Sequence, residues 1–130
     1  KDIVNKKHRV PENYPFIFED AIEKMDKTKK VKEVLNKMGL NKELERTKSK
    51  KIRTGKGKMR GRKYKRKVGP LIVVSNDCKL LKAAINIPGI NVIKVNELNA
   101  ELLAPGTQMG RLTIFTKAAI EKMEKEKLFL

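Results

Sequence analysis

Lysine and arginine are concentrated in one short run of this 130-residue chain, from Lys48 to Lys67. Twelve of the twenty residues in the run are Lys or Arg, and no Asp or Glu occurs between Glu45 and Asp77. Such side chains neutralise phosphate groups and release the counterions around them. A solvated surface normally intersperses opposite charges. The missing acids therefore favour a docking surface for a polyanion, with nucleic acid as the first candidate.

The run carries +12 of the formal net charge of +17, so the imbalance is local. Its arginines can pair with phosphate oxygens through two hydrogen bonds or stack on unpaired bases, and Tyr64 and Met59 add apolar faces between the cations. Because no helix-turn-helix or zinc finger is evident, structured RNA is favoured over DNA. The predicted RNA-binding residues are Lys48, Lys50, Lys51, Arg53, Lys56, Lys58, Arg60, Arg62, Lys63, Tyr64, Lys65, Arg66 and Lys67.

Three glycines punctuate the run, at Gly55, Gly57 and Gly61. Their spacing does not match the dinucleotide fingerprint, and no phosphate-binding loop motif of nucleotide hydrolases is present. We interpret them as positions where the backbone turns and approaches a phosphate surface closely. The glycines also prevent an apolar helical face, and no long apolar run occurs, which argues against a membrane partner. No cofactor and no small-molecule substrate are predicted.

The residues capable of catalysis are sparse. His8, the only histidine, lies between cations in "KKHRV" and is interpreted as solvated or facing phosphate. Asp20 and Glu23 follow a predicted strand, where acids suit the start of a helix. Ser75 is expected to cap a helix, and Cys78, the only cysteine, to be a small buried hydrophobe. We therefore predict no catalytic residue and no metal ligand.

Two other classes of function stay open at this point. One is an α/β enzyme acting on RNA, with Glu19 or Asp20 as a metal ligand beside the basic run. The other is a partner-binding module whose basic run binds an acidic protein. The absence of a secretory signal makes the cytoplasm the expected compartment.

The first half of the chain predicts one strand and two helices. Pro15–Phe18 is a short apolar run typical of a buried strand. Thr28 is the expected N-cap of a helix whose core face is Val31, Val34, Leu35 and Met38, and which Gly39 ends. Asn41 is expected to cap a second helix. The basic loop, residues 48–69, is predicted to be irregular, extended and poorly ordered unless bound.

The second half alternates strands with helices. Leu71–Val74 is a β-branched run typical of a central strand covered on both faces. The remaining predicted elements are a helix capped within Ser75–Asp77 with Leu81, Ala84 and Ile85 on its core face, a strand at Val92–Val95, a helical turn at Asn99–Gly106, a strand at Arg111–Thr116, and a helix capped by Thr116 with Ala119, Ile120 and Met123 facing inward. This order predicts a single domain over residues 1–130, a three-layer α/β/α fold with a mostly parallel sheet and an extended basic loop.

Several motifs make the chain identifiable. "GKGKMRGR" (Gly55–Arg62), "NAELLAPG" (Asn99–Gly106) and the C-terminal "GRLTIFTKAAIEKM" are the most specific, and "KKHRVPENYPFIFED" and "TKKVKEVLNKMGL" agree with them. Together the chain closely resembles the large-subunit ribosomal protein L-four family in its archaeal and eukaryotic form, over essentially its whole length.

The resemblance implies a structural component of the large ribosomal subunit with an α/β three-layer domain and no enzymatic activity. It implies large-subunit rRNA and neighbouring large-subunit ribosomal proteins as partners, subunit assembly and translation as the process, and a cytoplasmic location on the ribosome. By motif match, the residues expected against rRNA are Arg53, Lys56, Lys58, Arg60, Arg62, Lys63, Lys65 and Arg66.

The chain also departs from the resembled family, whose members are about twice as long. Their first half holds an initial strand and helix and a loop that reaches the wall of the peptide exit tunnel, so no tunnel role is assigned to any residue here. Without that half we expect an exposed sheet edge or apolar face and marginal stability of this chain alone.

Overall fold

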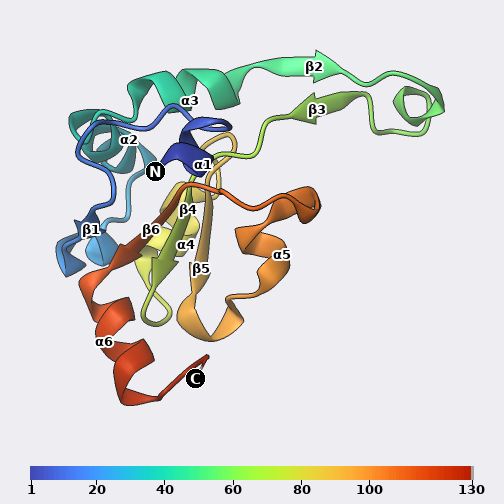
Figure 1. The fold of residues 1–130 in the computed structure, drawn as a ribbon. Helices are drawn as coiled ribbons and strands as arrows, with labels where there is room; N and C mark the ends of the chain where they lie inside the picture. The colour runs from blue at the N-terminus through green and yellow to red at the C-terminus, as the bar shows by residue number, and fades with distance from the viewer. Residues whose placement is uncertain (130) are drawn as a thin grey trace.

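A computed structural model describes residues 1–129 of the chain. The elements follow one another along the chain as the α-helices α1–α6, the 3-10 helices η1–η4 and the strands β1–β6 (Figure 1). Their bounds are α1 Asp2–Asn5, β1 Ile17–Phe18, η1 Asp20–Lys24, α2 Thr28–Lys37, α3 Asn41–Lys48, β2 Lys50–Ile52, η2 Lys56–Lys58, β3 Tyr64–Arg66, β4 Leu71–Val74, α4 Lys79–Ala84, β5 Asn91–Lys94, η3 Val95–Glu97, α5 Ala100–Leu103, η4 Pro105–Thr107, β6 Thr113–Thr116 and α6 Lys117–Lys125.

The main sheet has four strands in the order β1-β6-β4-β5, and all three pairings are parallel. Leu71 of β4 is registered with Asn91 of β5 and Thr113 of β6. All four residues of β4 are buried, because β4 is an inner strand with helices on both faces. The predicted α/β fold with a mostly parallel sheet is confirmed.

Alternate side chains of the strands enter two separate cores. Ile72, Val74 and Ile114 belong to the larger cluster, which also holds the apolar side chains of α2, α3 and α4. Leu71 and Val73 point to the opposite face and pack with residues of η3, α5 and α6. Because successive side chains of a strand point to opposite faces, one continuous apolar run can build both cores. The result is the three-layer arrangement.

The predictions of helix starts and ends were correct in part. Gly39 follows α2 with φ +80°, and Thr116 caps α6 by accepting the Ala119 amide at 3.3 Å. The prediction for Thr28 was wrong: it is the first residue of α2, and its hydroxyl donates to the Ala83 carbonyl at 2.8 Å. Asn41 likewise is not a cap but the first residue of α3, after Leu40.

One further prediction about α4 was wrong, and another was right only in part. Ser75–Asp77 do not cap this helix, because its N-cap position is Cys78, which is half-buried beside the larger core. The buried residues of the segment are Leu80, Ala83, Ala84 and Ile87, whereas Ile85 is 81% exposed. The spacing from Leu80 to Ile87 is the i, i+3, i+4, i+7 pattern of one helix face. Of the predicted core residues, Ala84 is buried and Leu81 packs against the larger core, whereas the prediction for Ile85 was wrong.

The edge strands of the main sheet are β1 and β5. β1 is only two residues long, and Ile17 on it is 58% exposed. Short edge strands limit pairing with other chains. The marginal stability expected of this chain stays a prediction.

Candidate nucleic-acid interface

The basic run forms an antiparallel hairpin that projects from the body of the molecule (Figure 1). Lys50 is paired with Arg66, Lys51 with Lys65 and Ile52 with Tyr64. The Arg53 amide extends the ladder by donating to the Lys63 carbonyl at 2.9 Å. We call residues 48–69 the arm. Its prediction as an extended segment was right, but its prediction as an irregular one was wrong.

The tip of the arm is a compact turn built on glycines. Gly55 and Gly61 have φ of +81° and +73°, and nothing lies within 4 Å of where a Cβ would stand on either residue. The Gly57 carbonyl accepts from the amides of Arg60 and Arg62 at 3.3 and 3.2 Å. The glycines therefore serve the sharp turns of the tip, because only Gly adopts these angles without cost.

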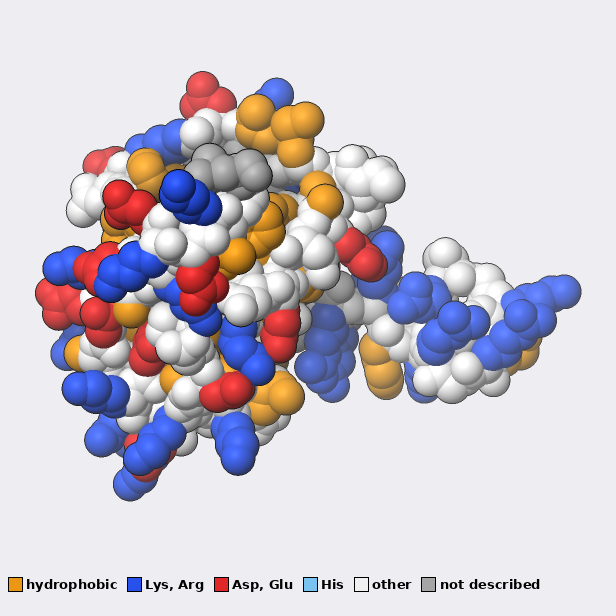
Figure 2. Space-filling model, turned by 90° about the horizontal axis from the view of Figure 1, so that it is seen from below, with side chains coloured by type: hydrophobic (Ala, Val, Ile, Leu, Met, Phe, Trp, Pro, Cys, Tyr) orange, Lys and Arg blue, Asp and Glu red, His pale blue; other side chains and the backbone are white. Residues whose placement is uncertain are grey.

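All cations of the arm except Arg53 are exposed, and none has a carboxylate partner within residues 1–129. From Lys48 to Lys67 every residue is exposed except Arg53 and Gly57, which are half-buried. Among residues 1–129, no Lys or Arg of the arm lies within ion-pair distance of an Asp or Glu. Figure 2 shows the projecting arm covered with Lys and Arg side chains, while acids and bases mix over the body.

Like charges lie directly opposite each other across the hairpin. Within the pair Lys50–Arg66 the two cations lie side by side on one face of the ladder, and within the pair Lys51–Lys65 they lie side by side on the other face. Like charges in such positions destabilise a two-stranded ladder, by about 0.2–1 kcal/mol per pair. The arrangement lowers the stability of the free hairpin and favours an anionic ligand that neutralises both strands.

Tyr64 gives one face of the arm an aromatic centre. The ammonium groups of Lys50 and Lys63 lie 5.4 and 5.6 Å from the centroid of its ring, within the range of cation–π attraction. Tyr64 is 52% exposed and Ile52 beside it 56% exposed. An exposed ring bracketed by cations can stack on a nucleobase while the ammonium groups meet phosphates.

A buried ionic cluster fixes the root of the arm on α3. Arg46 forms two hydrogen bonds to the fully buried Glu43, at 2.6 and 2.8 Å, and also donates to the Val68 carbonyl at 2.6 Å. His8 Nδ1 lies 2.7 Å from Glu43 Oε1. Burial would raise the pKa of Glu43, but hydrogen bonds from Arg46, His8 and the Arg9 amide lower it from 4.5 to about 2. His8 is only 5% exposed, so its prediction as solvated or phosphate-facing was wrong.

A second set of contacts holds the returning strand. The Gly69 amide donates to the Gly89 carbonyl at 2.8 Å, and buried Thr47 packs so closely that a Cβ on either glycine would lie 2.7 Å from it. Arg111 is 6% exposed and donates to the Gly69 and Leu102 carbonyls and to Asn91 Oδ1. Burial lowers the pKa of this guanidinium. The arm is thus anchored at both of its ends and free at its tip.

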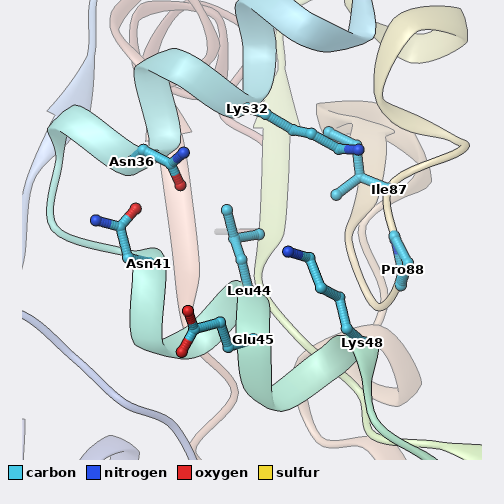
Figure 3. A pocket seen from close by; sticks show the side chains of 8 residues that line it. All are labelled: Lys32, Asn36, Asn41, Leu44, Glu45, Lys48, Ile87 and Pro88. Carbon is cyan, nitrogen blue, oxygen red and sulfur yellow. The ribbon is translucent and has the colours of Figure 1, made fainter.

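A pocket of about 310 Å³ lies beside the root, between α2, α3 and the loop after α4 (Figure 3). Lys48 and Lys32 line it from two sides, with Leu44 between them and the amides of Asn36 and Asn41 at one end. Lys48, the first predicted RNA-binding residue, therefore faces the α2–α3 side of the molecule. The other predicted residues lie along the hairpin and its tip.

The carboxylates that follow β1, including those considered for an enzyme acting on RNA, lie on the side of the sheet where its parallel strands end. We call this side the carboxyl edge, and the side where the strands begin the amino edge. Asp20 follows the carboxyl end of β1 and accepts the Ala118 amide at 2.8 Å. Glu23 accepts from the Ser75 amide and hydroxyl and from the Thr116 hydroxyl, at 3.1, 3.0 and 2.7 Å. The arm, in contrast, leads into the amino end of β4. The parallel strands place the two regions at opposite edges, so the prediction of Glu19 or Asp20 beside the basic run was wrong.

Within residues 1–129 no group of three or more His, Cys, Asp or Glu side chains is placed to hold a metal ion. No helix of that part of the chain is both long and apolar enough to span a bilayer.

Sequence reasoning missed the residues that position the arm. Arg46 lies within a helix and Arg111 lies just before a strand, and an arginine at either position usually indicates solvent exposure. Thr47, Gly69 and Gly89 carry no motif. Only the ionic pattern of Glu43 and Arg46 at i, i+3 was available as a signal, and it does not indicate burial.

The profile of the Ribosomal protein L4/L1 family matches residues 6–126. This chain belongs to that family. The resemblance found in the sequence is thereby confirmed.

Several curated relatives are similar over nearly the whole chain. "Large ribosomal subunit protein uL4" of Methanosphaera stadtmanae is 47% identical over 127 residues, covering 95% of this chain and 49% of that protein. The proteins of the same name from Methanococcoides burtonii and Nanoarchaeum equitans are 50% and 46% identical, over 90% and 98% of this chain and 47% and 48% of their own lengths. The chain therefore spans about half the length of these relatives.

Proposed function

We propose that this chain is a structural, non-enzymatic part of the large ribosomal subunit and that it binds the large rRNA through the arm. The observation that carries the proposal is the arm itself, a thin preformed hairpin with like charges opposed across its ladder and no acid along it. Family membership supports rRNA as the polyanion, because the relatives carry the name of a large-subunit ribosomal protein.

The proposed interface comprises the thirteen residues predicted from the sequence. Arg60 and Arg62 at the tip and Lys51 and Lys65 on the ladder neutralise phosphates, and Tyr64 stacks on an unpaired base. By holding rRNA and neighbouring ribosomal proteins together, a single domain over residues 1–130 supports subunit assembly and translation in the cytoplasm. No cofactor, membrane or small-molecule substrate takes part.

Preorganisation is the physical advantage of this arrangement. A disordered basic tail loses conformational entropy when it binds, at a cost that reduces its affinity. The root contacts of Arg46 and Arg111 and the ladder hydrogen bonds fix the arm before RNA arrives. Affinity then depends on the phosphate contacts with a smaller entropic penalty.

Crosslinking inside assembled large subunits tests the proposal. A zero-length or short amine-to-RNA crosslinker is applied to subunits that contain the chain, and the crosslinked peptides are mapped. Crosslinks concentrated in residues 48–67 are expected. Crosslinks confined to the C-terminal helix α6, with none in the arm, contradict the assignment.

A further inference from the structure

A second basic surface lies where the N-terminal segment passes the root of the arm. An open groove of about 1000 Å³ runs between residues 5–9 and the two strands of the arm. Nine of its thirteen lining residues are Lys or Arg, and none is Asp or Glu. The volume is at the upper end of the roughly 300–1,000 Å³ typical of small-molecule pockets, which are mostly apolar. A charged polymer suits this groove better than a small organic ligand.

The N-terminal wall of the groove is fixed by buried contacts. His8 is bound to Glu43, whose second oxygen accepts the Arg9 amide at 2.9 Å. Lys7 Nζ donates to the Gln108 carbonyl at 2.7 Å and also to the Met109 carbonyl. Lys6 and Arg9 are exposed on either side of these two residues. Their backbone positions are therefore set, while their charged ends remain available to a ligand.

The opposite wall is the root of the arm. Of the nine cations, Arg46 is paired with Glu43 and Lys7 is bound to carbonyls. The seven others have no carboxylate within ion-pair distance among residues 1–129. They are Lys6, Arg9, Lys50, Lys51 and Lys65–Lys67. Cations this close repel one another, and an anionic chain in the groove relieves the repulsion on both walls.

We propose that this groove holds the sugar-phosphate backbone of an RNA strand, with Lys6 and Arg9 contacting phosphates from one side and the root of the arm from the other. Val68 is the only apolar lining residue, so the groove offers no floor on which a base can stack. It recognises the backbone and not the sequence. The inference rests on the proposed function, because the groove shares its second wall with the arm, but Lys6 and Arg9 lie outside the arm.

The test measures binding of purified large-subunit rRNA at several salt concentrations for five forms of the chain. The forms are the unaltered chain, Lys6→Ala/Arg9→Ala, the charge-preserving Lys6→Arg/Arg9→Lys, the arm-tip variant Arg60→Ala/Arg62→Ala, and a control, Lys117→Ala/Lys125→Ala, that removes equal charge from α6. Both control lysines are exposed on a helix that begins at the carboxyl edge of the sheet, away from the arm. Thermal melting of each form checks that it is folded.

Lys6→Ala/Arg9→Ala is expected to reduce the magnitude of the slope of log K against log salt by about 1.4–1.8, the loss of two phosphate contacts. The charge-preserving variant should keep the slope, and the control should change it much less. A groove variant that behaves like the control, while the arm-tip variant weakens binding, overturns this inference and leaves the proposed function standing. An arm-tip variant that behaves like the control overturns the proposed function itself. Equal loss of binding to polyglutamate and to rRNA in the groove variant overturns the assignment to RNA.

Discussion

Charged side chains at the carboxyl edge of the parallel sheet have hydrogen-bond partners, whereas those of the arm at the amino edge have no acidic partner within residues 1–129. At the carboxyl edge, Asp20 and Glu23 accept hydrogen bonds from backbone amides and hydroxyls, and these bonds connect η1, which follows β1, to the ends of β4 and β6. At the amino edge, the arm displays cations that no acid of residues 1–129 neutralises. Ligands of open α/β sheets usually bind at the carboxyl ends of the strands. In this chain the structural carboxylates occupy that edge, and the exposed charge available for binding lies at the other.

The comparison teaches that the location of charged residues matters less than their partners. Glu43 and Arg46 lie at the root of the arm, yet the charge of Glu43 is fully buried and is paired with the half-buried Arg46. The arm cations have no such partners. We therefore expect substitutions in the paired clusters to change the free energy of unfolding, and substitutions in the arm to change RNA binding alone. Five predictions follow this division, in order of their effect on the free energy of unfolding.

Replacing Glu43 by Gln is expected to have the largest effect, about 3–5 kcal/mol of destabilisation at pH 7, because it leaves Arg46, whose side chain is only 16% exposed, beside a neutral partner. Urea unfolding of both forms measures it. A difference below about 1 kcal/mol would falsify the ionic role of the cluster.

The stability difference between the unaltered chain and Glu43→Gln is expected to depend on pH. The folded-state pKa of Glu43 is lowered from 4.5 to about 2, which corresponds to roughly 3 kcal/mol of stabilisation. Because the pKa is lowered on folding, this stabilisation is complete above about pH 4.5 and is lost as the pH falls towards 2. The stability difference between the two forms should therefore be about 2 kcal/mol smaller at pH 3 than at pH 7. A difference that stays constant contradicts the lowered pKa.

Replacing Gly89 by Ala is expected to cost about 2–4 kcal/mol, the sum of a positive φ and a clash with Thr47. Gly106→Ala is the matched control, because Gly106 also has a positive φ, +72°, but nothing within 4 Å of its Cβ position. Thermal unfolding of both variants isolates the clash. Equal losses of stability would show that Thr47 gives way and that the root of the arm is not tightly packed.

Replacing Glu23 by Gln is expected to cost about 1–2 kcal/mol, since three hydrogen bonds to a carboxylate become bonds to a neutral amide. The salt dependence of rRNA binding should be unchanged, because Glu23 lies at the edge opposite the arm. Unfolding and binding are measured on the same preparation. A loss of RNA binding without loss of stability would place RNA at the carboxyl edge and break the comparison.

Replacing Arg60 and Arg62 by Ala is expected to change the free energy of unfolding by less than about 0.5 kcal/mol, because both side chains are exposed. The slope of log K against log salt should decrease by about one for each lost phosphate contact. Salt titration of rRNA binding provides the measurement. An unaltered slope would mean that the tip of the arm faces water in the complex.

Elements with a strong local pattern were predictable from the sequence. Leu71–Val74 is apolar throughout and β-branched at three of its four positions, which favours a central strand, and Gly39 and Thr116 occupy positions whose chemistry ends or starts a helix. The twelve cations of the arm stand out in the sequence because no acid is interspersed among them, and their binding to rRNA stays a prediction.

The remaining features depend on contacts between distant residues. His8 is buried because Glu43, 35 residues later, accepts its hydrogen bond. The hairpin pairing of Ile52 with Tyr64 has no alternating apolar pattern to announce it, since nearly every side chain on it is polar and exposed. The core face of α4 was ambiguous because two phases of the segment offer similar apolar residues, and only packing selects Leu80 over Ile85.

One consequence of the strand order concerns how the chain folds. Within residues 1–129, β6 is the last strand along the chain, yet it lies inside the sheet, between β1 and β4 (Figure 1). Ile17 therefore has no partner strand until Phe115 has been made, and closing so long a loop carries a large entropic cost before the contact stabilises the fold. Pairing at such sequence separation slows folding. On a translating ribosome, this four-stranded sheet is completed only after β6 has emerged.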